Sequence, residues 1–576
     1  MTDMSQRDAT VDVDVLIVGA GPTGLMLANQ LARRGVKPRI IDRHAGPAQQ
    51  SRAMAVQART MEIYSKMGII DKALALGARA TGGNMWANGR WTARIPVGDI
   101  GQDLSPFPFV LMLGQDDNEL IMGEKLREFG IGVEWNTELV EIEQHPDHVD
   151  ATLKLPDGTT RRVTAAWVAG CDGSRSPVRE LSGIKFPGAP YEHTFFVADT
   201  EATGSMKPGE LNVYLWKDGF HLFFPMRGKD GWRVIGILPK SLRQRDDLTF
   251  EEVVPAIQQE AGTNLSFKAC HWFSTYRISH RAAEHFRDRR CFLLGDAAHI
   301  HSPAGAQGMN TGLQDAYNLA WKLALVVQGR ADAALLDTYE QERIPVAKRL
   351  LETTDRAFQL IVADGWLGSL FRTRILAAVA ARAMKFERVR KLAFRTIAQL
   401  GISYPGSSVS KALPGLPKDA PAAGDRFPWM RLSFAANGPA EDLFEHLDDT
   451  KFNLLMIGQS PIAPGTLDDF GGLLRIHTIA ADPANAAELV RVKVPQPSFY
   501  LLRPDGHVGL CGVRLEVADV KRYLAERVRL KAQDGLSNGN RPSSGDSHTD
   551  RKAQARGLSK DIGADYNAIT TALTSV

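Results

Sequence analysis

A glycine-rich turn between two predicted strands constrains the fold of this chain more than any other feature. Residues 13–18 (VDVLIV) become continuously apolar, as a parallel strand buried on both faces should. An apolar-periodic helix follows, and residues 37–43 (KPRIIDR) form a second predicted strand that carries Asp42 at its end. The turn before the helix has the spacing G-x-G-x-x-G, contributed by Gly19, Gly21 and Gly24. This order predicts a βαβ unit and an α/β fold.

The same turn predicts a bound dinucleotide. Gly19 permits the tight turn, Gly21 lets the backbone approach a pyrophosphate, and Gly24 allows close packing of helix on strand. The helix N-terminus adds free N–H groups and the positive end of the helix dipole. Asp42 can accept hydrogen bonds from the adenosine ribose, and its charge repels a 2′-phosphate, so FAD or an NAD-like nucleotide is expected here rather than NADP. The alternative is a glycine-rich turn in an α/β fold without a ligand.

The chain of 576 residues exceeds a single hydrophobic core, and its patterns divide it into several units. Two more strand–turn segments, residues 165–180 and 290–299, resemble the first unit in composition. Between them the hydrophobic pattern changes to period two with Asp-Gly turns, which indicates an inserted antiparallel sheet. The predicted units are a nucleotide-binding part and its helices at 1–185 and 280–400, the inserted sheet at 186–279, a C-terminal α/β domain at 411–532, and a disordered tail at 533–576.

Composition excludes several classes of function. The chain has 69 Lys and Arg against 66 Asp and Glu. This small excess of positive charge does not indicate a nucleic-acid partner. The four cysteines lie far apart without a C-x-x-C pair, which argues against a disulfide framework, a four-thiolate zinc site and a redox dithiol. The N-terminus has no secretion signal, and no apolar run approaches the ~18 residues that would span a bilayer. We expect a cytoplasmic protein.

Residues 295–316 (GDAAHIHSPAGAQGMNTGLQDA) allow two interpretations. Asp296, His299 and His301 could form a metal cluster, but two histidines two positions apart converge only on an extended strand, and no further ligand set follows. The segment instead becomes rich in Gly and Pro and leads into an apolar-periodic helix. This predicts a second helix N-terminus that faces a ligand. His299 and His301 are then packing or turn residues, and no metal site is expected.

At these residues the chain resembles a known family, the class A flavoprotein monooxygenases related to 4-hydroxybenzoate hydroxylase and phenol hydroxylase. The matching blocks are GAGPTG…IDR, CDGSRSPVR and GDAAHIHSPAGAQGMNTGLQDAYNLAWKL, spread over about two-thirds of the chain. The resemblance implies a Rossmann-like FAD-binding domain with an inserted antiparallel β-sheet that roofs the substrate pocket. The segments YPGSSV, AAGDRFP and LLRPDGHVGL are similar to the thioredoxin-like extension of the phenol hydroxylase branch. Without a C-x-x-C pair, that extension is expected to have no redox role.

The resemblance also implies roles for individual positions. Asp296 would bind the ribityl chain of FAD, Gln115 the phosphate or ribityl region, and Gly308 to Asn310 the pyrimidine edge of the flavin. Pro303 would lie by the reactive face, and Arg52 near the flavin and the nicotinamide. Asp172, Arg175 and Arg179 belong to a motif linked to both FAD and NADPH, although Arg179 could instead form a structural salt bridge. The positions assigned to FAD are Gly19, Gly21, Pro22, Thr23, Gly24, Asp42, Arg43, Arg52, Gln115, Asp172, Asp296, Pro303, Gly308, Met309 and Asn310.

The implied activity is hydroxylation of a phenolic or other electron-rich aromatic compound with NADH or NADPH and O₂, through a flavin hydroperoxide. The predicted catalytic positions are Pro303, Arg52, Tyr276 and Arg281. Tyr276 would bind the substrate hydroxyl, or is a packed strand aromatic, while Arg281 would lie near the phenol, or forms a surface ion pair. The family's acid near residues 51–57 has no counterpart here. A flavin-dependent reductase or dehydrogenase, a binding module without turnover, and a homodimer stay open as alternatives.

Overall fold

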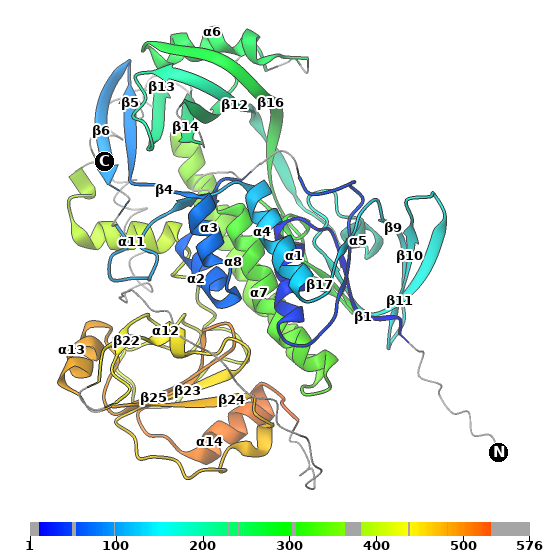
Figure 1. Ribbon diagram of the computed structural model, residues 1–576, viewed down its shortest axis with the longest axis vertical. Coiled ribbons are helices and arrows are strands. Elements are labelled where there is room, and N and C mark those ends of the chain that lie inside the picture. Colours follow the sequence, from blue (N-terminus) through cyan, green and yellow to red (C-terminus); the bar gives the residue numbers. More distant parts are fainter. Residues whose placement is uncertain are drawn as a thin grey trace.

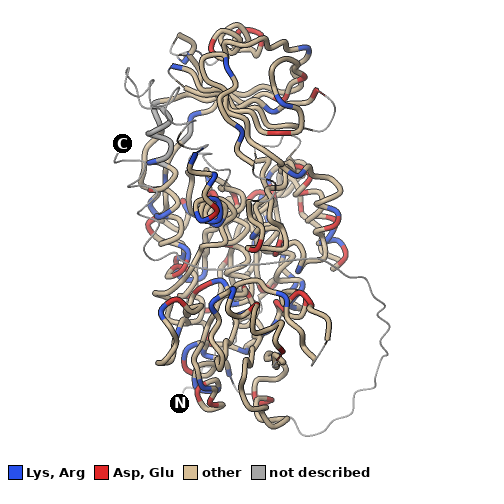
Figure 2. The backbone as a smooth tube through the Cα atoms, turned by 90° about the vertical axis from the view of Figure 1, so that its left-hand side faces the viewer, with Lys and Arg blue, Asp and Glu red and all other residues tan. Residues whose placement is uncertain are grey.

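The computed structural model describes residues 11–48, 53–96, 98, 100–217, 219–226, 230–239, 241–243, 245, 247–301, 307–362, 379, 382–435, 438–480 and 482–531. Its parts follow one another along the longest axis, with the inserted sheet at one end, the nucleotide-binding part in the middle and the C-terminal unit at the other end (Figure 1). Lys and Arg are interspersed with Asp and Glu along the chain (Figure 2), as the formal net charge of +3 suggests. Among the described helices, none is both long and apolar enough to cross a membrane.

The predicted βαβ unit is confirmed. β1 (Val13–Val18) pairs in parallel with β2 (Arg39–Ile41) on one side and with β11 (Thr160–Gly170) on the other. The parallel sheet continues to β18 (Cys291–Leu293) and to β8 (Val133–Glu134), and β17 (Arg287–Asp288) adds an antiparallel edge. The strand order is therefore β17-β18-β11-β1-β2-β8. A hairpin of β9 (Glu138–Gln144) and β10 (Val149–Lys154) extends β11 outward (Figure 1).

Helices complete the central body. α1 (Pro22–Ala32) packs between α4 (Gln115–Glu128) and α7 (Gly308–Val327), because all three turn apolar faces to one core. The other elements of this body are α2 (Ala58–Met67), α3 (Ile70–Leu76), α5 (Pro177–Leu181), the turns Gly295–Ala297 and Ala333–Leu336, α8 (Asp337–Val362), α11 (Glu387–Ile397) and the small sheet of β3 (Ala55–Val56), β7 (Leu111–Met112) and β4 (Ala78–Arg79).

The inserted sheet contains more of the chain than the range 186–279. Its order is β19-β16-β12-β15-β14-β13-β5-β6. The strands are β12 (Gly188–Gly204), β13 (Leu211–Trp216), β14 (Gly219–Pro225), β15 (Gly231–Ile237), β16 (Leu265–Ala282), β19 (His299–Ile300), β5 (Gly82–Ala87) and β6 (Arg90–Pro96). β5 and β6 come from the segment that the sequence analysis assigned to the nucleotide-binding part, and β5 joins in parallel to β13. α6 (Phe250–Ala261) covers the outer face (Figure 1).

The C-terminal unit is a five-stranded mixed sheet with the order β20-β26-β25-β23-β24. Its strands are β20 (Lys411–Ala412), β23 (Phe452–Ile457), β24 (Leu474–Ile479), β25 (Ser498–Leu502) and β26 (Val508–Gly512). α13 (Pro483–Arg491) and α14 (Val517–Arg522) contribute to separate hydrophobic clusters, one on each face. The unit also contains β21 (Arg431–Leu432), β22 (Glu441–Asp442) and α12 (Leu443–His446). The predicted tail lies outside the described residues.

Candidate functional site

The three glycine-containing motifs of the sequence meet at one edge of the parallel sheet. Gly19 follows β1, Cys171 follows β11, and Gly295 lies just beyond β18. A Cβ added to Gly19 would lie 2.3 Å from the carbonyl oxygen of Cys171, and one added to Gly295 would lie 2.7 Å from Oγ1 of Thr23. Thr23 also leaves no room for a Cβ on Gly312 of α7. Because parallel strands share their carboxyl edge, segments almost 300 residues apart form one site there.

The glycine turn at residues 19–24 packs tightly against the protein at Gly19 and Gly24 and has open space beside Gly21. Gly19 has φ +102°, a conformation that favours glycine, and a Cβ on Gly24 would lie 1.9 Å from the Gly19 carbonyl oxygen. A Cβ on Gly21 would meet no atom within 4 Å. Gly21 caps α1 without a side-chain hydrogen bond, and Pro22 begins the helix. The first turn therefore directs N–H groups into open space, which fits the pyrophosphate of a dinucleotide.

Asp42 lies at the end of β2 and holds this turn. Its Oδ2 accepts a hydrogen bond from the Ala20 N–H at 2.8 Å, and its Oδ1 accepts one from the His44 N–H at 2.8 Å. Nδ1 of His44 also lies 2.7 Å from Oδ1, so the second lone pair of Oδ2 is the one that can still accept from a ribose hydroxyl. Arg43 is exposed beside it. These contacts join the acid that is predicted to bind the ribose directly to the glycine turn.

Gln115 begins α4 and faces a buried acid. Its Nε2 donates to Oε1 of Glu119 at 2.8 Å, and the other oxygen of Glu119 accepts from the Ala48 N–H at 2.8 Å. Burial raises the pKa of Glu119, and the charge of nearby Asp42 adds to the rise. Gln115 thus orients an acid next to the predicted adenosine side of the site.

Asp172 has an unused oxygen inside the site. Its Oδ2 accepts from the Val178 N–H at 3.0 Å, whereas Oδ1 is buried and accepts no hydrogen bond from the described residues. Burial raises the pKa of Asp172 to about 6. A buried acceptor without a donor is costly, so this oxygen fits a donor group on a ligand.

Arg179 is a buried bridge rather than a ligand-facing cation. Its Nη1 donates to the Ala297 carbonyl at 3.0 Å and its Nη2 to the Ser174 carbonyl at 2.9 Å, while the guanidinium lies 4.0 Å from the centre of the Phe186 ring. Arg179 thereby ties α5 to the turn after β18. Arg175 of the same motif is exposed.

The turn Gly295–Ala297 exposes Asp296 and buries both of its neighbours. Asp315 of α7 is buried next to this turn and holds it through three contacts. It accepts from the Gly295 N–H at 3.0 Å, lies 2.8 Å from Nε2 of His299, and accepts from Nε of Arg343 at 2.6 Å. His299 is therefore held as a structural residue. Within the described part of the chain, Asp296, His299 and His301 form no group of converging metal ligands.

Asn310 is committed to protein partners. Its Oδ1 accepts from the Gln57 N–H at 2.9 Å and from Thr60 Oγ1 at 2.8 Å, and its Nδ2 donates to the Ala55 carbonyl at 2.8 Å. The side chain thus joins α7 to α2, and its Oδ1 already accepts two hydrogen bonds. Gly308 begins α7, and Met309 is half-buried against the central core. Pro303 and Arg52 lie outside the described residues.

The inserted sheet has an apolar face opposite α6. This face is lined by Met85, Ala87, Ala93, Phe195, Leu215, Phe220 and Ile237. Tyr276 of β16 packs against it, with its ring centre 6.0 Å from that of Phe195. Burial raises the pKa of Tyr276 to about 12. The phenol therefore stays neutral at physiological pH and can act as a hydrogen-bond donor.

Arg281 has different contacts from those of Tyr276. Its Nη1 donates to the Phe186 carbonyl at 3.2 Å, at the junction of the sheet with the central body. Tyr276 instead contacts Phe195, and the pairing of β16 with β12 has an irregularity between Arg277 and Ser279, which lies between the two positions. The two predicted substrate residues therefore have different contacts.

A buried ion pair on the Tyr276 face was not predicted from the sequence. Arg233 of β15 is fully buried and donates to both oxygens of Asp199 on β12, at 2.6 and 2.5 Å. Its Nη1 is buried and has no hydrogen-bond partner among the described residues. The charge of Arg233 also acts on Tyr276. Arginine is common at the polar positions of a strand with alternating polarity, so the sequence alone does not mark Arg233 as buried. Only its ion pair with Asp199 in the structure does so.

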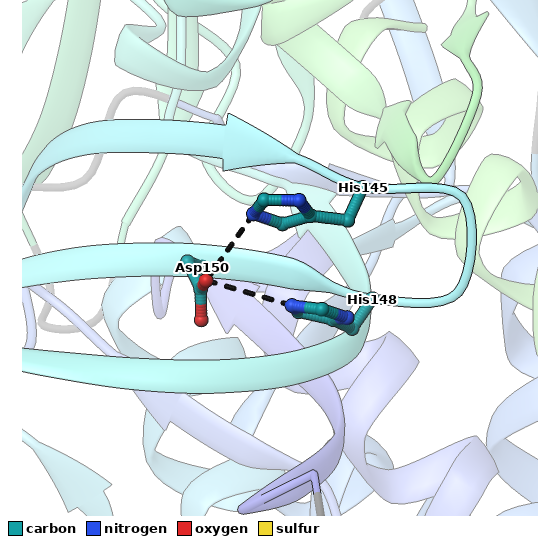
Figure 3. Close-up of side chains that lie close together, drawn as sticks. All are labelled: His145, His148 and Asp150. Carbon is teal, nitrogen blue, oxygen red and sulfur yellow. Dashed lines mark ion pairs between the residues drawn. The ribbon is translucent and has the colours of Figure 1, made fainter. Parts of the chain in front are cut away.

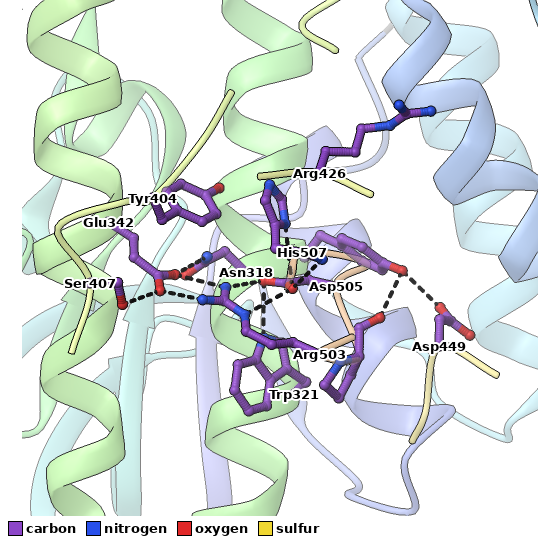
Figure 4. A network of polar contacts seen from close by, with 12 residues as sticks. Asn318, Trp321, Glu342, Tyr404, Ser407, Arg426, Asp449, Arg503, Asp505 and His507 are labelled. Carbon is purple, nitrogen blue, oxygen red and sulfur yellow. Dashed lines mark hydrogen bonds and ion pairs between the residues drawn. The ribbon is translucent and has the colours of Figure 1, made fainter. Parts of the chain in front are cut away.

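A polar network joins the site to the C-terminal unit (Figure 4). Arg503 binds both oxygens of Glu342 on α8, at 2.5 and 3.0 Å, and also forms an ion pair with Asp505. The next residue of α8, Arg343, donates to Oη of Tyr404 at 3.0 Å as well as to Asp315. The C-terminal unit is therefore connected through α8 to the turn at Gly295.

Comparisons with known proteins agree with this geometry. The profile of a family described as an FAD binding domain matches residues 12–354. The chain is 33% identical to 6-methylpretetramide 4-monooxygenase of Streptomyces rimosus, over 92% of this chain and 96% of the relative. It is 31% identical to pentachlorophenol 4-monooxygenase of Sphingobium chlorophenolicum, over 92% and 95% of the two chains.

Solved structures show the same fold. An anhydrotetracycline hydroxylase from Streptomyces rimosus superimposes with a TM-score of 0.68 at 28% identity, covering 87% of this chain and 95% of that one. The ternary complex of aklavinone-11 hydroxylase with FAD and aklavinone gives a TM-score of 0.74 at 26% identity, covering 90% and 99%.

Proposed function

Because the chain belongs to the class A FAD-dependent aromatic monooxygenases, we propose that it hydroxylates a polycyclic phenolic compound with NADH or NADPH as the electron donor and O₂ as the oxygen source. The observation that carries this proposal is the meeting of three glycine-containing motifs at one edge of the parallel sheet, in a chain whose inserted sheet also has an apolar face opposite α6. Three similar proteins are named for multi-ring substrates, namely 6-methylpretetramide, anhydrotetracycline and aklavinone. The pentachlorophenol enzyme shows that the same fold also takes a single ring.

The residues present fit FAD. The open space before Gly21 would receive the pyrophosphate, Asp42 the ribose, and the exposed Asp296 the ribityl chain. The backbone at Gly308 and Met309 would border the ring system. When bound, FAD supplies the chemistry that activates oxygen, and the protein supplies binding, orientation and exclusion of water.

Tyr276 and Arg233 support recognition of a phenol. Tyr276 is held neutral, so its hydroxyl can donate to the substrate oxygen. The free Nη1 of Arg233 places positive charge on the same face, which favours the ionised form of a phenol. An ionised phenol is richer in electrons at the ring carbon that receives oxygen. The surrounding apolar side chains suit a planar multi-ring ligand.

The proposal is tested by screening polycyclic phenols for stimulated NADH and NADPH oxidation by the purified protein, with ¹⁸O₂ as the gas. We expect a substrate that both accelerates oxidation of the nicotinamide and appears in the product with one labelled oxygen. Stimulated oxidation of the nicotinamide without label in the organic product would support a reductase or dehydrogenase instead.

We also infer that the C-terminal unit is thioredoxin-like in fold but takes no part in redox chemistry. In its support, β23 lies between a parallel strand, β24, and an antiparallel strand, β25, with a helix in the hydrophobic cluster on each face. Cys511 is buried on β26 and is the single cysteine after residue 400. Cys511→Ser is expected to keep FAD, fold and hydroxylation. Loss of hydroxylation in a folded, FAD-loaded variant would contradict this inference.

A further inference from the structure

We propose that the β9–β10 hairpin binds a divalent metal ion of the zinc class through His145, His148 and Asp150. These residues lie in and just after the turn between the two strands, where the side chains point toward one another (Figure 3). They are the one group among the described residues whose His, Cys, Asp or Glu ligand atoms converge in this way, all within 4.8 Å of one another. The site does not depend on the proposed hydroxylase reaction.

The distances between the ligand atoms suit tetrahedral coordination. Nε2 of His145 lies 3.3 Å from Oδ2 of Asp150, and Nε2 of His148 lies 3.5 Å from the same oxygen. Zinc bonds of about 2.0–2.2 Å to nitrogen and oxygen place neighbouring ligands of a tetrahedron about 3.3–3.5 Å apart. Small side-chain rotations would therefore suffice to bind an ion. The fourth position would be open to water or to Glu143, whose Oε1 lies 3.8 Å from Nε2 of His145.

Two further observations suit the binding of a cation by the histidines. Nε2 of His145 is buried and makes no hydrogen bond with the described residues, although a carboxylate oxygen is 3.3 Å away. Nδ1 of His148 lies 2.8 Å from Oδ1 of Asp147. A carboxylate on one ring nitrogen fixes the proton there and leaves the lone pair of the other nitrogen for a metal. His148 therefore has the outer partner that metal-binding histidines usually have.

The local charge permits a cation. Arg162 donates to Oδ2 of Asp150 at 2.5 Å and to Glu143 at 3.2 Å. Asp147 adds a third carboxylate, while Arg289 and Arg290 contact the same turn through the carbonyls of Gln144 and Pro146 rather than through the three proposed ligands. Thr164 Oγ1 holds the other oxygen of Asp150 at 2.8 Å and fixes the direction of Oδ2.

The ion would stabilise the hairpin rather than take part in the oxygen reaction. β9 and β10 form the outer extension of β11, away from α1 and the glycine turns (Figure 1). A metal at the turn would join the two strands and add stability by binding only the folded hairpin.

The experiment titrates ZnCl₂ into chelator-treated, FAD-loaded, full-length protein by isothermal titration calorimetry, with the bound zinc counted by elemental analysis. We expect about one zinc per chain and a rise in melting temperature that depends on zinc. The double variant His145→Ala/His148→Ala should lose at least about tenfold in zinc affinity, since outer-shell losses alone cost 10–100-fold. Its substrate-stimulated NAD(P)H oxidation should not change.

The matched control is His271→Ala/His285→Ala. These two exposed histidines each face one glutamate, at 3.2 and 3.1 Å, and lie in no converging group. The control variant should bind zinc as the wild type does. Absence of zinc binding by the wild type, or equal affinity in the His145/His148 variant and the wild type, would overturn the proposal. Equal weakening in both double variants would also overturn it, because it would show dispersed surface binding.

Discussion

Asp172 makes the stability of the FAD-free protein depend on pH. Its pKa rises from an ordinary value of about 3.9 to about 6 because the carboxyl is buried, so the folded chain keeps a proton that the unfolded chain releases between these values. Stability therefore falls as pH rises from 4 to 6, by at most about 3 kcal/mol. Asp172→Asn removes the charge at nearly constant volume. The FAD-free variant should be more stable than the wild type at pH 8, with the difference vanishing toward pH 4.

Urea denaturation of both FAD-free proteins across pH 4–8 measures this difference. A difference between the two proteins that does not change with pH would show that Oδ1 of Asp172 is stabilised in a way the structure does not display. With FAD bound, the same variant should hold the cofactor less tightly if that oxygen accepts a ligand hydrogen bond.

Tyr276 tests the substrate side of the site. Tyr276→Phe removes one hydroxyl and leaves the packing against Phe195 intact. The variant should still oxidise NAD(P)H but release more hydrogen peroxide per hydroxylated product, because the substrate oxygen loses a donor. One hydrogen bond of about 0.5–1.5 kcal/mol corresponds to a change of roughly two- to tenfold. Peroxide and product are quantified in the same assay, and an unchanged ratio would assign Tyr276 to packing.

At the scale of residues, the sequence predicted positions better than contacts. The G-x-G-x-x-G spacing predicts the roles of Gly19, Gly21 and Gly24, because each position of this motif has its own steric requirement for glycine. The inward commitment of the Asn310 side chain does not follow, because Gln57 and Thr60 lie 250 or more residues away. Buried acids such as Asp315 also look like surface residues in sequence until their partners are known.

At the scale of elements, two glycines at the start of α1 have different roles: Gly21 is expected to serve FAD binding, and Gly24 serves the packing of the helix. A Cβ on Gly21 meets open space, so Gly21→Ala should fold as the wild type does but obstruct the pyrophosphate, with a loss of about 1–3 kcal/mol, or roughly ten- to a hundredfold in FAD affinity. A Cβ on Gly24 overlaps the backbone of Gly19, so Gly24→Ala should lower stability by about 1–3 kcal/mol or more even without FAD.

Thermal unfolding of the FAD-free proteins and FAD titration by flavin fluorescence distinguish the two effects. The expected result is a normal melting temperature with weak FAD binding for Gly21→Ala, and a lowered melting temperature for Gly24→Ala. If Gly21→Ala binds FAD with the affinity of the wild type, the pyrophosphate does not bind at this turn.

The hairpin of β5 and β6 has a clear local signal in the sequence. Asn88 and Gly89 both have positive φ, 49° and 72°, as a two-residue hairpin turn requires. The Asn-Gly pair between MWA and RWTA is therefore a direct local signal. Its membership in the inserted sheet is not local, because β5 pairs with β13 more than a hundred residues later.

At the scale of the whole molecule, the sequence predicted a separate C-terminal unit but not its attachment. The strands and helices of that unit have local patterns, whereas its contact with the central body relies on buried charges. Trp321 of α7 packs in the same cluster as β23 and β25, and its Nε1 donates to Asp505 at 3.3 Å. Residues 411–428 (KALPGLPKDAPAAGDRFP) are rich in Pro, Gly and Ala, as a linker between independent domains often is, yet these contacts make the two parts one structure.

Arg503 is the residue on which this attachment most depends. It is fully buried, binds both oxygens of Glu342, and forms an ion pair with Asp505. Arg503→Met keeps much of the length of the side chain but leaves two buried acids with fewer partners, which should cost about 3–5 kcal/mol of unfolding free energy. The loss should also weaken FAD binding, because Glu342 is followed on α8 by Arg343, which anchors Asp315 beneath the turn at Gly295.

The matched control is Arg514→Gln in the same unit. Arg514 is 85% exposed and pairs with Glu516 at 2.7 Å, so its removal should cost less than about 1 kcal/mol and leave FAD binding unchanged. Urea unfolding followed by tryptophan fluorescence and by FAD release compares the two variants. If Arg503→Met lowers stability but leaves FAD affinity at the wild-type value, α8 does not transmit the contact to the flavin site. If it lowers stability no more than Arg514→Gln does, the buried network does not hold the C-terminal unit in place.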